Sequence, residues 1–284
     1  MEALDASDIG QARRQARLLL DQHALAYAAH IFFDNRRVAT VGDSVTGGSA
    51  RPSKPFGSRL LQEALPEDLL ALRHYLRQQH LETGDLIARA GEALRHLVIP
   101  IDAVLANVDN TEVGAGLMTA MIGCEAASDL PALLADTPVA WDVRVQQAGA
   151  VWCLPPGPLN QQQAKSPHLR RLLQTKARDV AVQTAQHVVC VTRHEVGARI
   201  AGWILSITAR TGRSTVRVRQ EDLAILLGAQ RSTVNTALGL LKGIDAIGIG
   251  RGAISVRNGA LLRHSACDCH RQPLVPHEAG SSDF

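Results

Sequence analysis

The sequence has no uninterrupted apolar segment of the length that a membrane helix requires. Such a helix needs roughly 18 to 20 consecutive apolar residues, and no run approaches that length. Residues 1–20 also contain acids and arginines where a secretory signal peptide would have a continuous apolar stretch. We therefore expect a cytoplasmic protein without a membrane partner.

Cysteine is scarce and unevenly placed. The five cysteines are an odd number scattered over a long chain, which is not typical of a secreted disulfide framework, and residues 1–123 contain none. Cys267, Cys269 and His270 place three potential metal ligands within four residues. A closed zinc site needs four donors, however, and no second Cys or His pair lies nearby at the usual spacing. We predict no metal site and structural or incidental thiols, with a metal or redox role as the alternative.

Histidine is absent from residues 97–155. An enzyme with a barrel active site of the cupin type would need clustered histidines and carboxylates on neighbouring strands, and this stretch offers no histidine for it. We therefore predict that the chain is not an enzyme and has no catalytic residues.

The 284 residues, 46% of them apolar, are enough to bury large cores, and about two domains are expected. Residues 7–34 are rich in alanine and leucine and are predicted to be helical, with Ser7 or Asp8 as the cap. Glycine, serine and proline accumulate from Val41 to Ser58, which indicates a linker. Residues 1–56 therefore form an N-terminal arm, either an accessory dimer contact or a flexible extension.

Short extended runs separated by turn residues follow from Arg59 to about Pro156. The runs are residues 86–90, 96–100, 114–121, 140–145 and 148–154. Many short strands at this spacing favour a jelly-roll β-barrel over residues 57–165, because an alternating α/β fold would need long helices between the strands. The predicted fold class is α+β.

Residues 167–191 run for some seven helical turns with no glycine and no proline after the first position. Residues of one helix face, apolar except for two polar members, recur at spacings of four and three, as in a two-stranded coiled coil. We predict a dimerisation helix over residues 166–192, with an intramolecular packing helix as the alternative. The predicted seam consists of Leu173, Ala177, Val180, Thr184, His187 and Val191.

Two short amphipathic helices separated by Gly228 lie between Arg219 and Lys242, which is the layout of a helix-turn-helix. In the second helix Val234, Ala237, Leu238 and Leu241 share one face. A polar outer face suited to the DNA major groove remains, formed by Arg231, Ser232, Asn235, Thr236 and Gly239.

The elements around this motif complete a winged domain over residues 193–264, followed by a tail at 265–284. An amphipathic helix is expected at about residues 195–211, and residues 246–256 alternate around Gly250-Arg251-Gly252 as a β-hairpin wing does. Residues 193–264 hold eleven Arg and Lys against four Asp and Glu, a net of +7 in a chain of net +3. Because the basic charge is local, only this part is expected to bind DNA.

The order of barrel, long helix and winged helix-turn-helix resembles the Crp/Fnr superfamily of bacterial transcription regulators over about residues 57–264. The most specific stretches are residues 220–234 and 250–256, together with residues 60–69 and 84–92 in the sensor domain. The resemblance implies a homodimeric transcription regulator that binds double-stranded DNA. RNA polymerase and an unidentified small-molecule effector are further candidate partners.

The resemblance also implies roles for single residues. Arg231 matches the arginine that contacts guanine, and Thr233 matches a position that touches a phosphate. Ser232 and Thr236 replace the family's usual glutamate and arginine, so the usual operator is not expected, and Asn235 is a candidate for adenine readout. Further phosphate candidates are Arg217, Arg219, Lys242 and Arg251.

The sensor domain departs from the cyclic-nucleotide sensors of the family. Cys124 interrupts the Gly-Glu pair of their phosphate-binding cassette at Gly123 and Glu125, and Val139 stands where an arginine should neutralise the cyclic phosphate. A buried phosphodiester without that partner would not recover its desolvation cost, and Arg144 could reach it only from an unusual register. We therefore predict no tight binding of cyclic AMP or cyclic GMP.

Other sensing modes leave alternatives open. The absence of cysteine from residues 1–123 excludes the iron-sulfur site of the family's oxygen sensors. Possible axial haem ligands are His74, His80, His96 and Cys124. A haem- or cysteine-based regulator of the same fold is thus one alternative function, and a dimeric ligand-binding protein that does not bind DNA is another.

Overall fold

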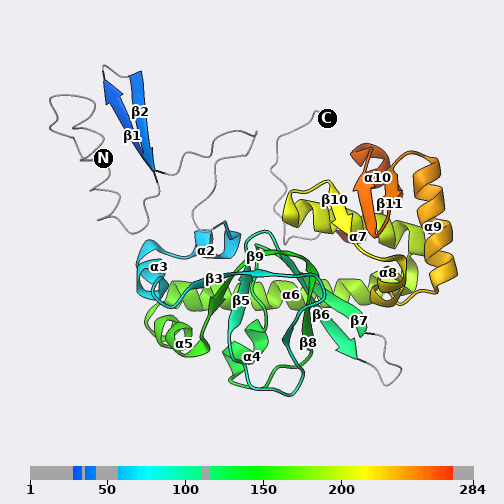
Figure 1. Cartoon of the computed structure of the whole chain (residues 1–284). Coiled ribbons are helices and arrows are strands. Elements are labelled where there is room, and N and C mark those ends of the chain that lie inside the picture. Colours follow the sequence, from blue (N-terminus) through cyan, green and yellow to red (C-terminus); the bar gives the residue numbers. More distant parts are fainter. Residues whose placement is uncertain (1–27, 34–35, 43–56, 111–115, 271–284) are drawn as a thin grey trace.

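The computed structural model describes residues 28–33, 36–42, 57–110 and 116–270. A domain of antiparallel sheets, called here the β-domain (residues 57–154), is followed by one long helix and a mixed C-terminal domain (residues 196–270), as Figure 1 shows. Within these ranges no helix combines the length and apolarity needed to cross a bilayer. The predicted order of β-domain, long helix and winged helix-turn-helix is confirmed.

Two antiparallel sheets form the β-domain. One has the order β3-β9-β5 and the other β4-β8-β6-β7. Their strands are β3 (Arg77–Leu81), β4 (Leu86–Ala88), β5 (Leu97–Pro100), β6 (Val104–Asn110), β7 (Gly116–Ile122), β8 (Asp142–Gln147) and β9 (Gly149–Leu154). Five of these coincide with the runs predicted from the sequence. β3 and β6 were not predicted, because polar residues in both obscure the alternation of a strand.

Short helices cover the β-domain. They are α2 (Arg59–Glu63), α3 (Pro66–Leu72), α4 (Leu130–Ala135) and α5 (Pro156–Lys165). The buried Asp68 fixes α3 to the end of α5 and the start of the next helix, because its carboxylate accepts hydrogen bonds from Gln162 Nε2 at 2.7 Å and from Ser166 Oγ at 2.9 Å.

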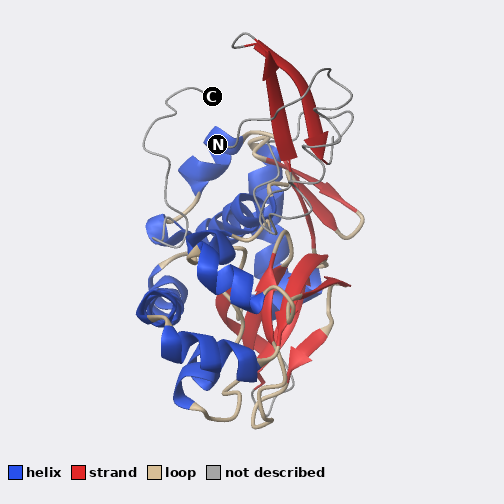
Figure 2. Cartoon of the chain, turned by 90° about the vertical axis from the view of Figure 1, so that its left-hand side faces the viewer, coloured by secondary structure: helices blue, strands red, loops and turns tan. Residues whose placement is uncertain are grey.

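The long helix α6 (Pro167–Arg193) lies along the β-domain and leads to the C-terminal domain (Figure 1). Seen from the side in Figure 2, most of the helices lie on one side of the strands. It begins where the Ser166 hydroxyl accepts a hydrogen bond from Leu169 N, with Pro167 in the first turn, a position at which proline lacks no needed donor. At about 1.5 Å per residue its 27 residues span about 40 Å. The predicted long helix is therefore confirmed.

Part of the α6 face that was predicted to be a dimer seam packs within the chain. Leu173 is buried with the α2, α3 and α4 leucines, and Val180 is buried against strands of the β-domain. Ala177, Thr184, His187 and Val191 are partly buried on the same side. Leu173 and Val180 thus pack on the β-domain and its helices, because a stripe at spacings of four and three is equally satisfied by these neighbours, and contact of the other four residues with a second copy stays a prediction.

The N-terminal arm contains a β-hairpin. Strands β1 (Ala28–Phe33) and β2 (Arg36–Gly42) pair antiparallel, with Ala28 opposite Gly42 and Phe33 opposite Arg36. The helix predicted for residues 7–34 is therefore wrong over 28–33, where β-branched and aromatic residues override the helical preference of the alanines. Its remaining part, residues 7–27, and most of the predicted linker, residues 43–56, lie outside the described ranges.

The C-terminal domain is a winged helix-turn-helix. Its elements are α7 (Val196–Thr211), β10 (Thr215–Arg217), α8 (Gln220–Leu226), α9 (Arg231–Gly243), β11 (Ile247–Gly250), β12 (Ala253–Val256), α10 (Gly259–Ser265) and the 3-10 turn η1 (Asp268–His270). β11 and β12 form the predicted wing, and β10 adds a third strand beside β12.

Asp129 carries a testable pH effect. It precedes α4 with a φ of 52° and is 4% exposed, and this burial raises the pKa of its carboxyl group from 3.8 to about 6. Between these values the folded chain binds the proton more tightly than the unfolded chain, so stability falls as pH rises. We expect Asp129→Asn to raise the free energy of unfolding by about 2 to 3 kcal/mol at pH 8, and by little below pH 4.

Urea unfolding at the two pH values measures this effect. Asp136→Asn is the matched control, because Asp136 has the same left-handed backbone, with φ 51°, but lies exposed at the other end of α4. Equal gains at both pH values, or equal gains from both variants, would contradict the assignment.

Candidate nucleic-acid interface

The second helix of the helix-turn-helix motif has one buried and one open face. Val234 and Leu238 have no exposed surface, and Ala237 and Leu241 are also buried. The outer positions are all exposed: Arg231, Ser232, Thr233, Asn235, Thr236 and Gly239. The predicted division of α9 into an inner and an outer face is therefore confirmed, while contact of these side chains with DNA stays a prediction.

The turn between α8 and α9 depends on Gly228. Its φ of +57° lies in the left-handed region, and a Cβ there would lie 3.0 Å from Leu117 Cδ1 of β7. A side chain at this position would be strained by the backbone and crowded by the β-domain. The turn that orients α9 is thus also a contact between the two domains.

Within α9, Arg231 is the first residue of the helix, after the N-cap Gln230, and it is exposed. Thr236 donates its hydroxyl proton to Ser232 O at 3.1 Å, which leaves its oxygen as an acceptor on the outer face. A basic side chain at the helix start and polar groups one turn later match the groove-reading layout of this motif.

The predicted phosphate-contacting residues have different surroundings. Lys242, Arg251 and Arg217 are exposed, and Arg251 lies between the two wing strands. Arg219 is already engaged, because its guanidinium binds both carboxylate oxygens of Asp222, at 2.8 and 3.0 Å, and Glu221 at 3.1 Å. Arg219 would have to share its charge with these acids to bind a phosphate.

A buried ion pair joins the two domains, and no sequence motif indicates it. Arg210 Nε on α7 donates to Glu125 Oε1 at 2.8 Å, with side chains 4% and 2% exposed. The same carboxylate oxygen accepts from Gly123 N at 3.2 Å. No local pattern could have indicated this pair, because its members lie 85 residues apart.

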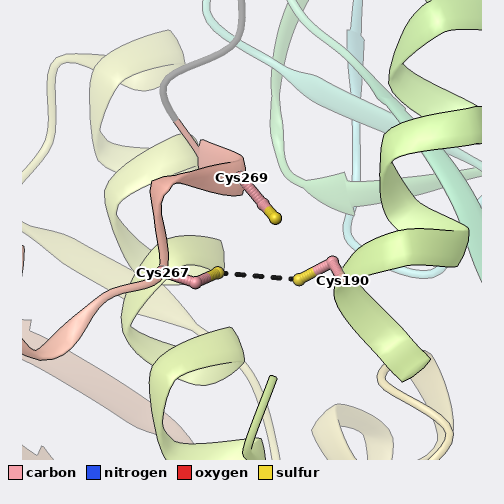
Figure 3. Close-up of side chains that lie close together, drawn as sticks. All are labelled: Cys190, Cys267 and Cys269. Carbon is pink, nitrogen blue, oxygen red and sulfur yellow. Dashed lines mark hydrogen bonds between the residues drawn. The ribbon is translucent and has the colours of Figure 1, made fainter. Parts of the chain in front are cut away.

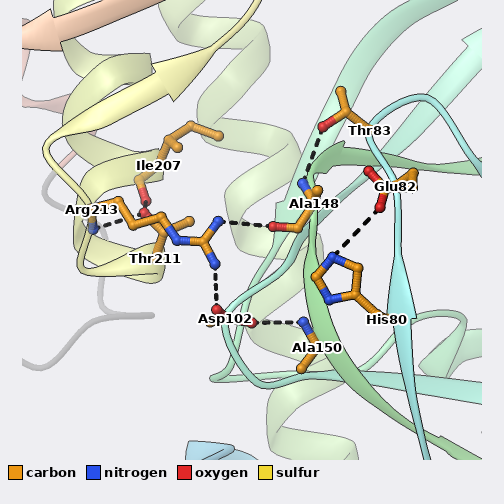
Figure 4. Close-up of polar contacts among 9 residues, drawn as sticks. All are labelled: His80, Glu82, Thr83, Asp102, Ala148, Ala150, Ile207, Thr211 and Arg213. Atoms are coloured by element: carbon orange, nitrogen blue, oxygen red, sulfur yellow. Dashed lines mark hydrogen bonds and ion pairs between the residues drawn. The ribbon is translucent and has the colours of Figure 1, made fainter.

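Further polar contacts hold β10 and its preceding turn against the β-domain. Arg213 donates to Ala148 O at 3.0 Å and pairs with Asp102, which in turn accepts from Ala150 N at 2.7 Å (Figure 4). Gln147 Nε2 donates to Arg217 O at 2.8 Å, while Arg217 N donates to Gln147 Oε1 at 3.0 Å.

An apolar cluster spans the same boundary. It joins residues of β6 and β7 with residues of the helix-turn-helix. The members include Val108 of β6, Met118 of β7, Leu223 of α8, Leu227 directly after α8, and Leu238 of α9. Each domain thus completes its core with the other, and the position of the helix-turn-helix depends on the β-domain.

The structure also places the residues that the sequence analysis considered for cyclic-nucleotide and haem binding. Val139, at the position of the missing arginine, is 2% exposed, and Arg144 pairs with Asp142 at 3.8 Å. The candidate haem ligands His74, His80 and His96 are all exposed. Cys124, the fourth, is half-buried, and burial raises the pKa of its thiol.

Three cysteines meet at the junction of α6 and the C-terminal turn η1 (Figure 3). The Sγ atoms of Cys190 and Cys267 are 3.6 Å apart, and those of Cys190, Cys267 and Cys269 all lie within 4.8 Å of one another. The hydrogen bond from the Cys190 thiol lowers the pKa of Cys267 to about 5 and raises that of Cys190. The spacing of donors around residue 267 did not indicate Cys190, because it lies 77 residues away along the chain.

Comparison with known proteins identifies the C-terminal part most directly. Residues 198–265 match the family model of the Crp-like helix-turn-helix domain. No curated protein matches the chain.

Solved structures with the same fold include three bacterial regulators. A CRP-family transcriptional regulator from Thermus thermophilus has a TM-score of 0.56 at 16% identity, covering 66% of this chain and 96% of that one. FixK2 from Bradyrhizobium japonicum has a TM-score of 0.56 at 14% identity, covering 68% and 98%. The c-di-GMP responsive regulator CLP of Xanthomonas campestris has a TM-score of 0.55 at 13% identity, covering 68% and 99%.

The chain therefore has a Crp-like helix-turn-helix domain at its C-terminal end and, over the described residues, the fold of Crp/Fnr-type transcriptional regulators.

Proposed function

We propose that the chain is a homodimeric, sequence-specific DNA-binding transcription regulator without enzymatic activity. The observation that carries this is the open outer face of α9, with Arg231 at its first position, in a domain that matches the Crp-like helix-turn-helix family model. The other candidate, a dimeric ligand-binding protein that does not bind DNA, leaves the net +7 of residues 193–264 without a role.

The dimer forms through the face of α6 that the β-domain leaves open. Val182, Val188 and Val189 are 39%, 61% and 47% exposed, and Ala181 and Ala185 are exposed between them. The spacings along this stripe are those of a coiled coil: four and then three residues in Ala181, Ala185 and Val188, and three and then four residues in Val182, Ala185 and Val189. A second copy of α6 is the occupant that buries this stripe and brings two recognition helices to one duplex.

The regulator does not depend on cyclic AMP or cyclic GMP. Glu125 is engaged by Arg210, and the buried Val139 offers no charge for a cyclic phosphate. Arg144 is held by Asp142, whose carboxylate would have to release it. A phosphodiester in this domain would lose hydration without gaining a cationic partner.

The state of the β-domain reaches DNA through α6 and the domain boundary. The shared apolar cluster and the Glu125–Arg210 pair make the placement of α9 depend on β6, β7 and the segment after β7. An effector, or a chemical change, that favours one placement over another would shift the dimer between two states of different DNA affinity.

Selection of duplex fragments from a random pool tests the function. We expect an enriched inverted repeat with half-sites about 10 bp apart, bound by two copies of the chain. Val188→Glu should yield monomers by analytical ultracentrifugation and weaken binding to the selected fragment at least tenfold. Leu70→Glu on α3, at a side chain 49% exposed, is the control that should stay dimeric. Absence of enrichment over non-specific binding would refute the function, and a dimeric Val188→Glu variant would refute the interface.

A further inference from the structure

The three-cysteine cluster has a fourth donor beside it. His194 follows the last residue of α6, and its Nε2 atom lies 3.9 Å from Cys269 Sγ. The other ring nitrogen, Nδ1, is buried and has no hydrogen-bond partner among the described residues. Two ligand types thus converge from two distant segments: Cys190 and His194 from the end of α6, and Cys267 and Cys269 from the segment around η1.

The distances suit tetrahedral coordination. With metal–sulfur bonds of about 2.3 Å, two thiolates on one zinc ion lie about 3.8 Å apart. The Cys190–Cys267 separation is 3.6 Å, and the third sulfur lies within 4.8 Å of both. The three sulfurs alone form a set within 4.8 Å, and His194 lies 3.9 Å from Cys269, so the His194 ring would have to move toward Cys190 and Cys267 to close a four-donor site.

The surroundings suit a site with bound thiolates. Gln186 Nε2 on α6 donates a hydrogen bond to Cys269 Sγ at 3.1 Å, which is the kind of outer-shell contact that orients a metal ligand. Three thiolates and one divalent ion leave a net charge of −1. The buried guanidinium of Arg199 lies within electrostatic range of Cys190 and Cys267 and offsets that charge.

We propose that Cys190, Cys267, Cys269 and His194 form a binding site for a thiophilic divalent cation, with Zn²⁺ as the ion whose donor preference and geometry they match. A Cys190–Cys267 disulfide is the competing use of these thiols, but it would leave Cys269, its Gln186 contact and His194 without a role.

A metal here would connect the end of α6 to the last turn of the C-terminal domain. η1 lies directly on α7, because a Cβ on Gly202 would lie 3.3 Å from His270 Cβ and 3.8 Å from Cys267 Sγ. The ion would therefore fix the angle at which the chain turns from α6 into α7. The metal site stands independently of DNA binding, whereas its effect on recognition-helix placement rests on the proposed function.

Cobalt substitution of the full-length chain, purified anaerobically with a reductant, tests the site. We expect one Co²⁺ per chain, with thiolate-to-cobalt charge-transfer absorption and tetrahedral d–d bands that Zn²⁺ abolishes. Cys269→Ser should weaken Co²⁺ binding more than 100-fold, and Gln186→Ala by about 10- to 100-fold, the range for outer-shell losses. Cys124→Ser is the matched control, because that half-buried thiol lies outside the cluster.

Other variants and outcomes separate the alternatives. His194→Ala should shift the d–d bands and weaken binding, whereas His264→Ala, at an exposed site, should change neither.

Absence of charge-transfer absorption, or a Cys190–Cys267 disulfide in metal-free protein isolated from cells, would overturn the proposal. Cobalt binding without any DNA binding would retain the site and refute the proposed function. Cobalt binding with DNA affinity unchanged by a chelator would refute only the coupling between them.

Discussion

Glu125→Ala is expected to lower the free energy of unfolding by about 3 to 5 kcal/mol. The substitution leaves the Arg210 guanidinium, whose side chain is 4% exposed, without its carboxylate partner at a buried position. It also removes the acceptor for Gly123 N. Removing one partner of a buried pair leaves an uncompensated charge, which costs more than the pair itself contributes.

Two companion variants separate the charge from the packing. Glu125→Leu combined with Arg210→Met removes both charges and should restore most of the loss, because apolar groups of similar volume replace buried pairs at little cost. Glu82→Ala is the exposed control, since Glu82 and His80 form a pair 3.7 Å apart at side chains 77% and 62% exposed. It should change stability by less than about 1 kcal/mol. Urea unfolding measures all three, and equal losses in the single and double variants would show that the ion pair is not the cause.

Arg231→Ala is expected to weaken binding to the selected DNA by about 1 to 3 kcal/mol, roughly 5- to 150-fold. The loss should be confined to fragments with the preferred base at one position of each half-site. Arg231→Lys keeps the charge but loses the planar pair of donors, and should relax the base preference nearly as much as alanine does.

Lys242→Ala provides the contrast for Arg231. An exposed lysine that contacts only phosphate should weaken binding to all sequences alike and reduce the salt dependence by about one unit of slope. Binding isotherms at several salt concentrations, on the selected site and on a scrambled one, distinguish the two patterns. Unchanged discrimination in Arg231→Ala would exclude direct readout by this residue.

Elements defined by local pattern were predicted well from the sequence. The helix-turn-helix, the wing and α6 each have a continuous periodicity, and glycines lie at the points where the backbone must turn. Every residue of the buried face of α9 was predicted correctly, because its apolar residues all lie on one side of the helix and only that side can face the rest of the domain.

Features that depend on distant partners could not be predicted in this way. α6 carries two apolar stripes, one through Leu173 and Val180 and one through Val182 and Val189, and periodicity alone does not tell which of them packs on its own β-domain. The Glu125–Arg210 pair and the contact between Cys190 and Cys267 could not be predicted either. The two members of each pair lie 77 or more residues apart and share no sequence motif.

The contact between Gln147 and Arg217 involves only the main chain of residue 217. The amide side chain of Gln147 bonds as a neighbouring peptide group would, so this attachment is retained with any amino acid at position 217 that has a backbone N–H, which excludes only proline. That side chain is exposed and can be exchanged during evolution without loosening the domain. Under the proposed function, a change of this side chain would alter a contact with phosphate, and with it the affinity for all DNA sequences alike, while β10 stays attached to the β-domain.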